Sequence, residues 1–291
     1  MAVALPASRR GWEQRLRERR AVDRMGHTGQ AAGCHTEPVE PQPEPLAQYF
    51  DGWYADMART PVKDEIEQRH LGLPPHLLSA SLLGWAGIAE VTQALQLAAG
   101  GVLLDLACGR GGYGLEIAAR TGARLVGIDF SAEALRQAGE QARRLRRAAE
   151  FRVGNLTATG LDAGSAAAVL CIDAIQFAEP PDAAFREIRR VLVPGGRAVL
   201  TCWEPRVPDD DRLAGRLRRV DLAAGLAAAG FAHVEVTERP DWRAAERAMW
   251  AEAAALEPGT DPALRSFHDE GVRSLATFGL LRRVMASATA P

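Results

Sequence analysis

The chain has 291 residues and a mass of 31.3 kDa, with 35 basic and 37 acidic side chains and a formal net charge of −2. This balance lacks the basic excess of nucleic-acid-binding proteins, and no apolar run reaches the roughly 18 residues that span a bilayer. With 47% apolar and 25% charged residues, we expect a soluble globular protein with one large domain or two small ones.

Residues 1–45 differ in composition from the rest of the chain. Their apolar residues precede the first arginines, the reverse of a secretory signal, which favours a cytoplasmic protein. Residues 9–24 carry seven arginines against three acidic residues, and residues 26–45 are rich in Gly, Pro and Glu. This composition buries too little apolar surface to offset the entropy of ordering, so we expect a disordered extension. Its basic part could bind a partner, although a solvated tail is the simpler interpretation.

Helices are expected between residues 46 and 100, as a lid in front of the main domain. Residues 45–58 place apolar and aromatic side chains at helical spacing and end before Pro61. Residues 76–97 repeat this spacing and precede a pair of glycines.

From residue 101 onward, strand and helix patterns alternate. Continuous apolar runs predict strands over residues 101–107, 123–130, 151–153, 166–177 and 197–203. Helical patterns separate most of them, over residues 113–122, 131–148 (with Ser131 as N-cap) and 181–196. A further helix (221–231), a strand (233–239), a helical insertion (about 240–281) and a last strand (282–288) complete the chain. Such alternation indicates βαβ units and a parallel, doubly wound α/β sheet.

The most informative segment is LLDLACGRGGYG, residues 103–114. A glycine-rich turn after the first strand lets the backbone approach a ligand at the carboxyl edge of the sheet. Asp129 ends the second strand, 20 residues after Gly109, where this fold presents a carboxylate to ribose hydroxyls.

Asp105 separates two classes of ligand. A dinucleotide places its pyrophosphate over this turn, where a carboxylate would repel it. S-adenosylmethionine (SAM) carries an ammonium and a sulfonium instead, for which a nearby carboxylate is favourable. The pattern therefore favours SAM over NAD(P).

Residues 101–205 resemble the class I SAM-dependent methyltransferases, in the small-molecule, specialised-metabolite branch. LDLACGRGGYG is similar to their first motif and GIDFS to the acidic motif of the second strand. VGNLTATGL, CIDAIQF and LVPGGRAVLT are similar to the later motifs, in the family's order. The resemblance implies a Rossmann-like seven-stranded sheet with helices on both faces and a reversed last strand, over residues 101–291.

The resemblance also implies a cofactor site, with S-adenosylhomocysteine as the product. Asp129 would hold both ribose hydroxyls, with Phe130 against the adenine. Asn155, where the family more often has Asp, would meet the adenine amino group through its amide oxygen. The methionine end would be surrounded by Asp105, Ala107, Gly109 and Gly111, with Leu156 on the adenine ring, Asp173 near the sulfonium and Tyr54 on the SAM carboxylate.

The catalytic residue is left open. Many relatives have a histidine after the fourth strand, where this chain has Ile175-Gln176-Phe177. Gln176 can position an acceptor but cannot act as a base, so another residue is the base or the acceptor needs little base catalysis. The candidates are His76, Gln176 and Asp173. A surface position remains the simpler interpretation of His76.

Aromatic residues in the segments 50–85 and 203–267 favour a flat acceptor, although a core role explains them equally well. We therefore expect methyl transfer to an O, N or C atom of an aromatic or heteroaromatic natural product, by a monomer or homodimer. The alternatives are a catalytically silent SAM-binding protein and, with less support, an NAD(P)-dependent oxidoreductase. We expect no metal, because no histidines or cysteines have ligand spacing, and no nucleic-acid or membrane partner.

Overall fold

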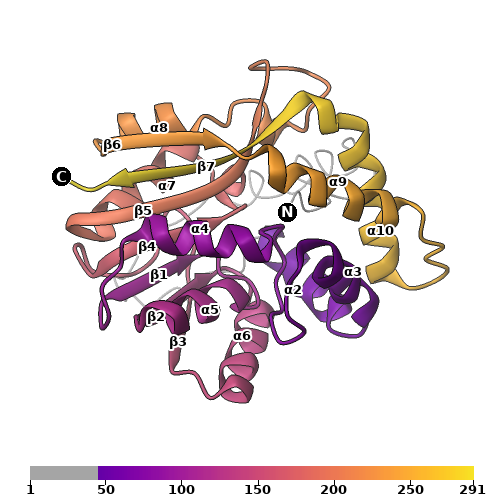
Figure 1. The fold of residues 1–291 in the computed structure, drawn as a ribbon, viewed down its shortest axis with the longest axis horizontal. Coiled ribbons are helices and arrows are strands. Elements are labelled where there is room, and N and C mark those ends of the chain that lie inside the picture. Colours follow the sequence, from indigo (N-terminus) through magenta and orange to yellow (C-terminus); the bar gives the residue numbers. More distant parts are fainter. Residues whose placement is uncertain (1–44) are drawn as a thin grey trace, which may run out of the picture. The chain divides into compact units, whose positions relative to one another are not determined.

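A computed structural model describes residues 45–291, so the expectations for residues 1–44 lie outside the described residues. Figure 1 shows the arrangement of the elements. The first half contains α2 (Pro45–Met57), α3 (Pro61–Leu71), α4 (Trp85–Leu95), β1 (Val102–Leu106), α5 (Gly112–Thr121), β2 (Arg124–Asp129), α6 (Ala132–Leu145) and β3 (Ala149–Val153). The second half contains β4 (Ala166–Ile172), η1 (Ile175–Phe177), α7 (Pro181–Val191), β5 (Leu192–Pro205), η2 (Gly215–Leu217), α8 (Leu222–Ala228), β6 (Ala232–Glu238), α9 (Pro240–Ala254), α10 (Pro262–Thr277), η3 (Phe278–Leu280) and β7 (Leu281–Thr289).

The described strands form one seven-stranded sheet in the order β3-β2-β1-β4-β5-β7-β6. Strands β1 to β5 pair in parallel, with Asp105 of β1 opposite Gly127 of β2 and Leu170 of β4. β7 runs antiparallel to both β5 and β6, so the expected reversed last strand is confirmed. The direction of winding changes between β1 and β4, and a doubly wound sheet opens a crevice for ligands at that point.

Alternation along the strands divides the core into two layers. Leu103, Leu170 and Val199 face α4 and α5 on one side of the sheet. Val169 and Leu200 face α7 and α8 on the other side. Because both faces are covered by helices, the central strands read as continuous apolar runs.

Helices α2, α3, α9 and α10 lie beyond the end of the sheet toward which β6 points (Figure 1), which is the carboxyl end of the parallel strands. Lys63 of α3, the only lysine of the chain, forms a buried ion pair with Glu67. Its ammonium lies 5.8 Å from the Trp53 ring of α2 and 5.4 Å from the Phe267 ring of α10. A charge buried in this way holds three helices of the group together.

Three local predictions need correction. The strand expected over residues 166–177 ends at Ile172, and residues 175–177 form the 3₁₀ helix η1. The helix expected over residues 76–97 begins only at Trp85, because the preceding backbone bonds elsewhere: the amides of Leu82 and Leu83 donate to the Asp173 carboxylate and the Tyr113 hydroxyl. The helix expected over residues 181–196 ends at Val191, and β5 already begins at Leu192. The pattern analysis also missed α3, whose few apolar residues make a weak stripe.

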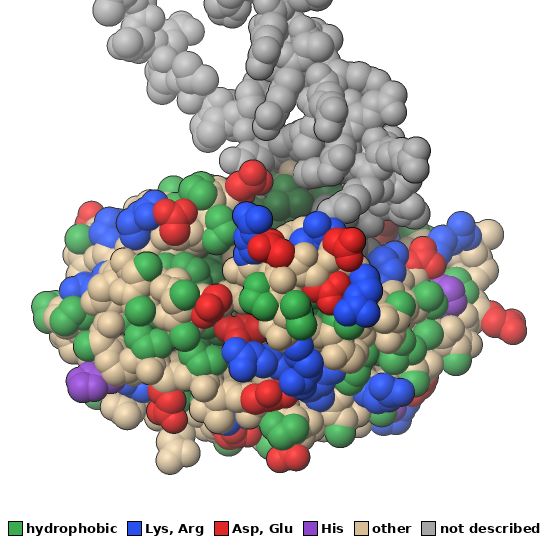
Figure 2. All heavy atoms as spheres, turned by 90° about the horizontal axis from the view of Figure 1, so that it is seen from above, with side chains coloured by type: hydrophobic (Ala, Val, Ile, Leu, Met, Phe, Trp, Pro, Cys, Tyr) green, Lys and Arg blue, Asp and Glu red, His purple; other side chains and the backbone are tan. Residues whose placement is uncertain are grey.

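Among residues 45–291, every helix is too short or too polar to cross a membrane. On the face shown in Figure 2, basic and acidic side chains lie among one another. Exposed ion pairs of the described part include Arg206–Glu238, whose charged atoms lie 2.7 Å apart. Within the described part, Cys108, Cys171 and Cys202 are free thiols, while Cys34 lies outside it.

Two helical glycines give a matched test of the packing. A Cβ on Gly225 of α8 would lie 2.3 Å from a ring carbon of Phe185, whereas a Cβ on Gly52 of α2 meets nothing within 4 Å. We expect Gly225→Ala to lower the free energy of unfolding by about 1–3 kcal/mol through overpacking. Gly52→Ala should raise it by up to about 1 kcal/mol through helix propensity. Urea denaturation of both variants checks this, and equal effects would contradict the packing of α7 on α8.

Candidate functional site

The glycine-rich turn between β1 and α5 forms the floor of the site. Its backbone takes positive φ at Ala107 (59°), Gly109 (52°) and Gly111 (76°). A Cβ at Gly112 would lie 2.1 Å from the Leu78 carbonyl oxygen, so the segment that crosses over α5 requires glycine there. The predicted residues 107, 109 and 111 therefore lie in one tight turn at the carboxyl end of β1.

Asp129 joins this turn to the end of β2. Its carboxylate accepts hydrogen bonds from the amides of Gly109 (2.8 Å) and Ser131 (2.9 Å). Burial raises its pKa to about 6, although these amide donors act in the opposite direction. The spacing of 20 residues thus brings the two predicted parts of the site into direct contact.

Asp105 lies beside Asp129 and is 3% exposed. Burial, and then the neighbouring Asp129 charge, raise its pKa to about 7. A Cβ on Gly114 would lie 2.4 Å from its Oδ2, so α5 packs directly on the carboxyl group. Neither carboxylate forms a salt bridge within residues 45–291, and a cationic ligand would relieve the cost of burying both.

Helix α2 supplies the other wall. The Tyr54 hydroxyl lies over the turn, 2.8 Å from where a Cβ on Gly109 would be. The Phe50 ring packs on Phe130 (centroids 5.2 Å apart) and on Phe177 (5.8 Å). Asp51 accepts hydrogen bonds from the Ser131 hydroxyl (2.6 Å) and the Glu133 amide (3.1 Å), and so fixes α2 on the start of α6. The structure therefore brings Tyr54 to the turn and Phe130 against the same helix, while their expected contacts with SAM stay predictions.

Asn155 and Leu156 follow β3 at the next strand end. The Asn155 amide oxygen accepts hydrogen bonds from the Thr157 amide and hydroxyl, both at 2.9 Å. This oxygen is therefore engaged within the chain, contrary to the expectation that it faces the adenine amino group. Leu156 is buried against the α7 and α8 layer of the core.

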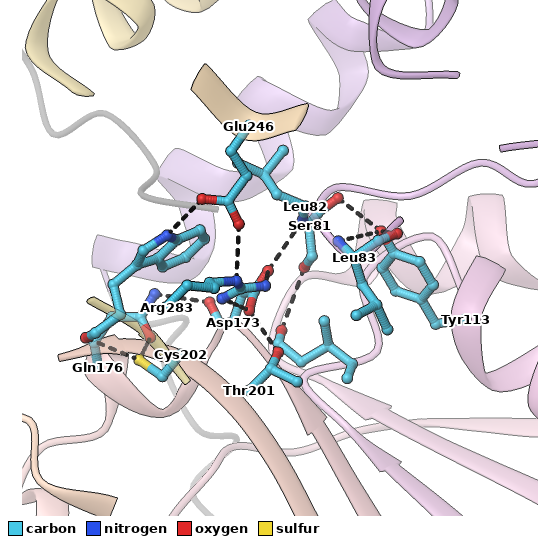
Figure 3. A network of polar contacts seen from close by, with 12 residues as sticks. Ser81, Leu82, Leu83, Tyr113, Asp173, Gln176, Thr201, Cys202, Glu246 and Arg283 are labelled. Atoms are coloured by element: carbon cyan, nitrogen blue, oxygen red, sulfur yellow. Dashed lines mark hydrogen bonds and ion pairs between the residues drawn. The ribbon is translucent and has the colours of Figure 1, made fainter. Parts of the chain in front are cut away.

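Asp173 ends β4 and anchors a buried network (Figure 3). It is 2% exposed, has a φ of 57°, and forms a bidentate ion pair with Arg283 of β7. It also accepts hydrogen bonds from the Thr201 hydroxyl (2.6 Å) and the Leu82 amide (3.0 Å). Burial alone would raise its pKa, but the Arg283 guanidinium holds it well below its usual range.

Arg283 connects this strand end to α9. Its Nε lies 2.8 Å from Oε1 of Glu246, and its guanidinium carbon lies 4.1 Å from the centre of the Trp203 ring. The Trp203 indole donates to the other Glu246 oxygen at 3.0 Å. Burial raises the pKa of Glu246, and the Arg283 charge opposes this rise.

Of the three catalytic candidates, Asp173 and Gln176 lie together at the end of β4, and His76 lies apart from them. The Gln176 amide donates to the Asp173 carbonyl (2.7 Å) and accepts from the Cys202 thiol (3.0 Å), so it is held at the strand end. His76 is half-exposed, and its Nε2 lies 3.9 Å from Oε2 of Glu116 in α5. Its backbone carbonyl accepts a hydrogen bond from the Gln141 side chain of α6. Its contacts therefore lie on α5 and α6 and not on β4. Asp173 is a weak base because its pKa is held low.

Sequence patterns missed Arg283, Glu246 and Asp51. Arg283 is a buried charge in the strand LRRVMASAT, and Glu246 shares a helix face with Trp242 and Trp250. A charge at a core position was the available signal. Among residues 45–291, no three His, Cys, Asp or Glu side chains gather as metal ligands do.

The sequence is similar to a known family and to several known proteins. Residues 103–196 match the family described as "Methyltransferase domain". The chain is 31% identical over 161 residues to phosphoethanolamine N-methyltransferase 3 of Arabidopsis thaliana, an alignment that covers 52% of this chain and 33% of that one. It is 30% identical over 160 residues to ubiquinone biosynthesis O-methyltransferase of Xanthomonas oryzae pv. oryzae, with coverage of 55% and 64%. It thus spans a third of the plant relative's length.

Solved structures show the same fold. Geranyl diphosphate C-methyltransferase from Streptomyces coelicolor, in complex with Mg²⁺, a geranyl thiolodiphosphate and S-adenosyl-L-homocysteine, has a TM-score of 0.61 at 19% identity and covers 86% of this chain and 100% of its own. Phosphoethanolamine N-methyltransferase 2 of Haemonchus contortus, in complex with SAM, gives 0.62 at 20% identity, covering 73% and 54%. The 4+2 cyclase SpnF gives 0.60 at 22%, covering 70% and 80%.

The raised pKa of Asp105 makes stability depend on pH. The pKa rises from 3.8 to about 7 on folding, so its contribution is present below pH 4 and is lost as the pH rises through 7. Between those values we expect the free energy of unfolding to fall by at most about 1.4 kcal/mol per pH unit from this group. Asp105→Asn should reduce this dependence of the free energy of unfolding on pH. Urea denaturation from pH 5 to 8 checks this against Asp162→Asn, an exposed control. Parallel profiles for wild type and Asp105→Asn would contradict it.

Proposed function

This chain contains a class I methyltransferase domain, and from that premise we propose that it transfers the methyl group of SAM to an O, N or C nucleophile of a small molecule. The observation that carries the proposal is the pair of buried carboxylates, Asp105 and Asp129, at the glycine-rich turn. Two anions without a described salt bridge suit the ammonium and sulfonium of SAM, and they disfavour the pyrophosphate of NAD(P).

The roles of the site residues follow from this proposal. Asp105, Ala107, Gly109 and Gly111 would surround the methionine end, and the Tyr54 hydroxyl above Gly109 would meet its carboxylate. Asp129 would accept hydrogen bonds from the ribose hydroxyls, because a carboxylate that already binds two amides has lone pairs left. The adenine would lie against Phe130 and Leu156, with Asn155 contributing other atoms than its engaged amide oxygen.

SAM supplies an activated methyl group, so the protein needs mainly to align the two reactants and exclude water. We propose that α2 and α3, with α9 and α10, form the lid that does this. The helices would shield the strand ends while an acceptor enters beside Phe50 and Phe177.

The acceptor is proposed to be a small aromatic or heteroaromatic molecule. The rings of Phe50 and Phe177 and the Arg216 guanidinium, 5.2 Å from the Phe177 ring, offer stacking partners for a flat ligand. Because Gln176 cannot act as a base and Asp173 is a weak one, the best acceptors are nucleophiles that need little deprotonation, such as a neutral amine or an electron-rich aromatic carbon.

A second candidate is a SAM-binding protein of this fold that catalyses another reaction or none. The weak bases at the end of β4 support it, and so does the fold shared with a cyclase. Turnover of SAM to S-adenosylhomocysteine with a panel of phenols, amines and indoles would separate the two candidates.

Binding of the cofactor can be measured without an acceptor. We expect calorimetry to give micromolar dissociation constants for SAM and S-adenosylhomocysteine and no binding of NADH. Asp129→Ala should weaken SAM binding more than about tenfold, because it removes the ribose acceptor. Asp162→Ala is the matched control. Binding of NADH but not of SAM would overturn the proposal.

The pH dependence of SAM binding gives a second test. Asp105 must lose its proton to face a cation, and Asp129 must lose its proton to accept from the ribose hydroxyls; their pKa values lie near 7 and 6. SAM affinity should therefore fall about tenfold from pH 8 to pH 6, with proton release on binding. Calorimetry in buffers of different ionisation enthalpy measures that release. Asp105→Asn should abolish most of the dependence, and an unchanged slope would exclude Asp105 as its source.

A further inference from the structure

Arg283 is a charged side chain with 0% exposure. Its charged partners, Asp173 and Glu246, are distant from it in the sequence. Its ion pair with Asp173 joins residues 110 positions apart, from the antiparallel β7 to the carboxyl end of β4 (Figure 3). Two nitrogens reach the carboxylate, a third faces Glu246, and the plane stacks on Trp203. Only a guanidinium has the donors and the flat face for this set of contacts.

Asp173 in turn holds the segments that surround the strand end. Its carboxylate accepts a hydrogen bond from the Leu82 amide, and its backbone carbonyl accepts one from the Gln176 side chain. The Ser81 hydroxyl donates to the Ile172 carbonyl at 3.3 Å, and the Tyr113 hydroxyl donates to the Ser81 carbonyl at 2.8 Å. The Leu82 contact therefore ties the segment 79–83 to the Asp173 carboxylate, and the Gln176 contact ties η1 to the Asp173 backbone.

The backbone at Asp173 needs such a restraint. A φ of 57° at a residue with a Cβ is sparsely populated, and it persists only where surrounding contacts hold it. Arg283 and Thr201 bind the carboxylate from β7 and β5, and Leu82 binds it from above α5. Of these three partners, Arg283 alone also balances the buried charge.

We propose that Arg283 is a positioning residue of the methyl-transfer site. Acting through Asp173, it fixes the end of β4 and the loop 79–83 against the reacting end of the cofactor, and its contact with Glu246 sets α9 over the same point. It touches neither reactant. This inference rests on the proposed function, because it takes SAM to bind at this strand end.

The test uses SAM as the probe, and it measures affinity by calorimetry and the ¹³C shift of bound methyl-labelled SAM. The variants are Arg283→Lys, Arg283→Met, Asp173→Asn and the double variant Asp173→Asn/Arg283→Met. Lysine keeps the charge but lacks the planar fork, so Arg283→Lys separates geometry from charge. Arg197→Met is the matched control: Arg197 donates to Thr289 at the opposite end of the same β5–β7 pair.

We expect Arg283→Lys and Arg283→Met each to weaken SAM binding about tenfold or more and to move the methyl resonance. Arg197→Met should change neither readout. In the Asp173→Asn background, Arg283→Met should cause no further loss, because its effect passes through Asp173. Where Arg283→Met alone fails to fold by circular dichroism, Asp173→Asn and Asp173→Asn/Arg283→Lys make the same comparison.

Losses that multiply in the double variant would indicate a general structural role and overturn the inference. Unchanged affinity and methyl shift in Arg283→Lys would overturn it as well. In both cases wild-type binding of SAM would leave the proposed function intact. Failure of the wild type to bind SAM would overturn both the function and this inference.

Discussion

The ion pair between Asp173 and Arg283 joins the two halves of this domain. β4 belongs to the parallel part of the sheet, and β7 is the antiparallel strand inserted between β5 and β6. A guanidinium and a carboxylate buried together tolerate little displacement, because each is costly without the other. Loop 79–83, the 3₁₀ helix after β4 and α9 all make contacts with this pair or with its direct partners. The carboxyl end of the sheet is consequently built around a fixed charge.

A second pair of carboxylates, at the glycine-rich turn, has the opposite character. Asp105 and Asp129 have raised pKa values because burial penalises their charged forms, and backbone amides compensate only in part. One charge cluster of the strand ends is therefore balanced within the chain, while the other gains from a cationic ligand. This difference separates a region built for rigidity from a region built for binding. The proposed placement of a positively charged cofactor at the turn rests on this difference.

Helix α2, part of the proposed lid, contacts both of these regions. Phe50 bridges the rings of Phe130, after β2, and Phe177, after β4, while Asp51 caps the start of α6. A single helix thus contacts the ends of both strands that flank β1. Under the proposed function, displacing α2 would uncover the turn and these rings together.

The sequence by itself determined most of the order of elements and the position of the turn, because apolar runs, glycines and the Asp105–Asp129 spacing are local patterns. The reversed last strand was implied by the family resemblance and not by these patterns. The sequence also placed Ser131 correctly as the N-cap of α6, because the Ser131 side chain accepts a hydrogen bond from the Ala134 amide. Only the tertiary structure decided that residues 76–84 are not helical, since their amides bond to Asp173 and Tyr113 from other elements. It also paired Asp173 with Arg283, a contact across 110 positions that strand pairing creates and local periodicity does not encode.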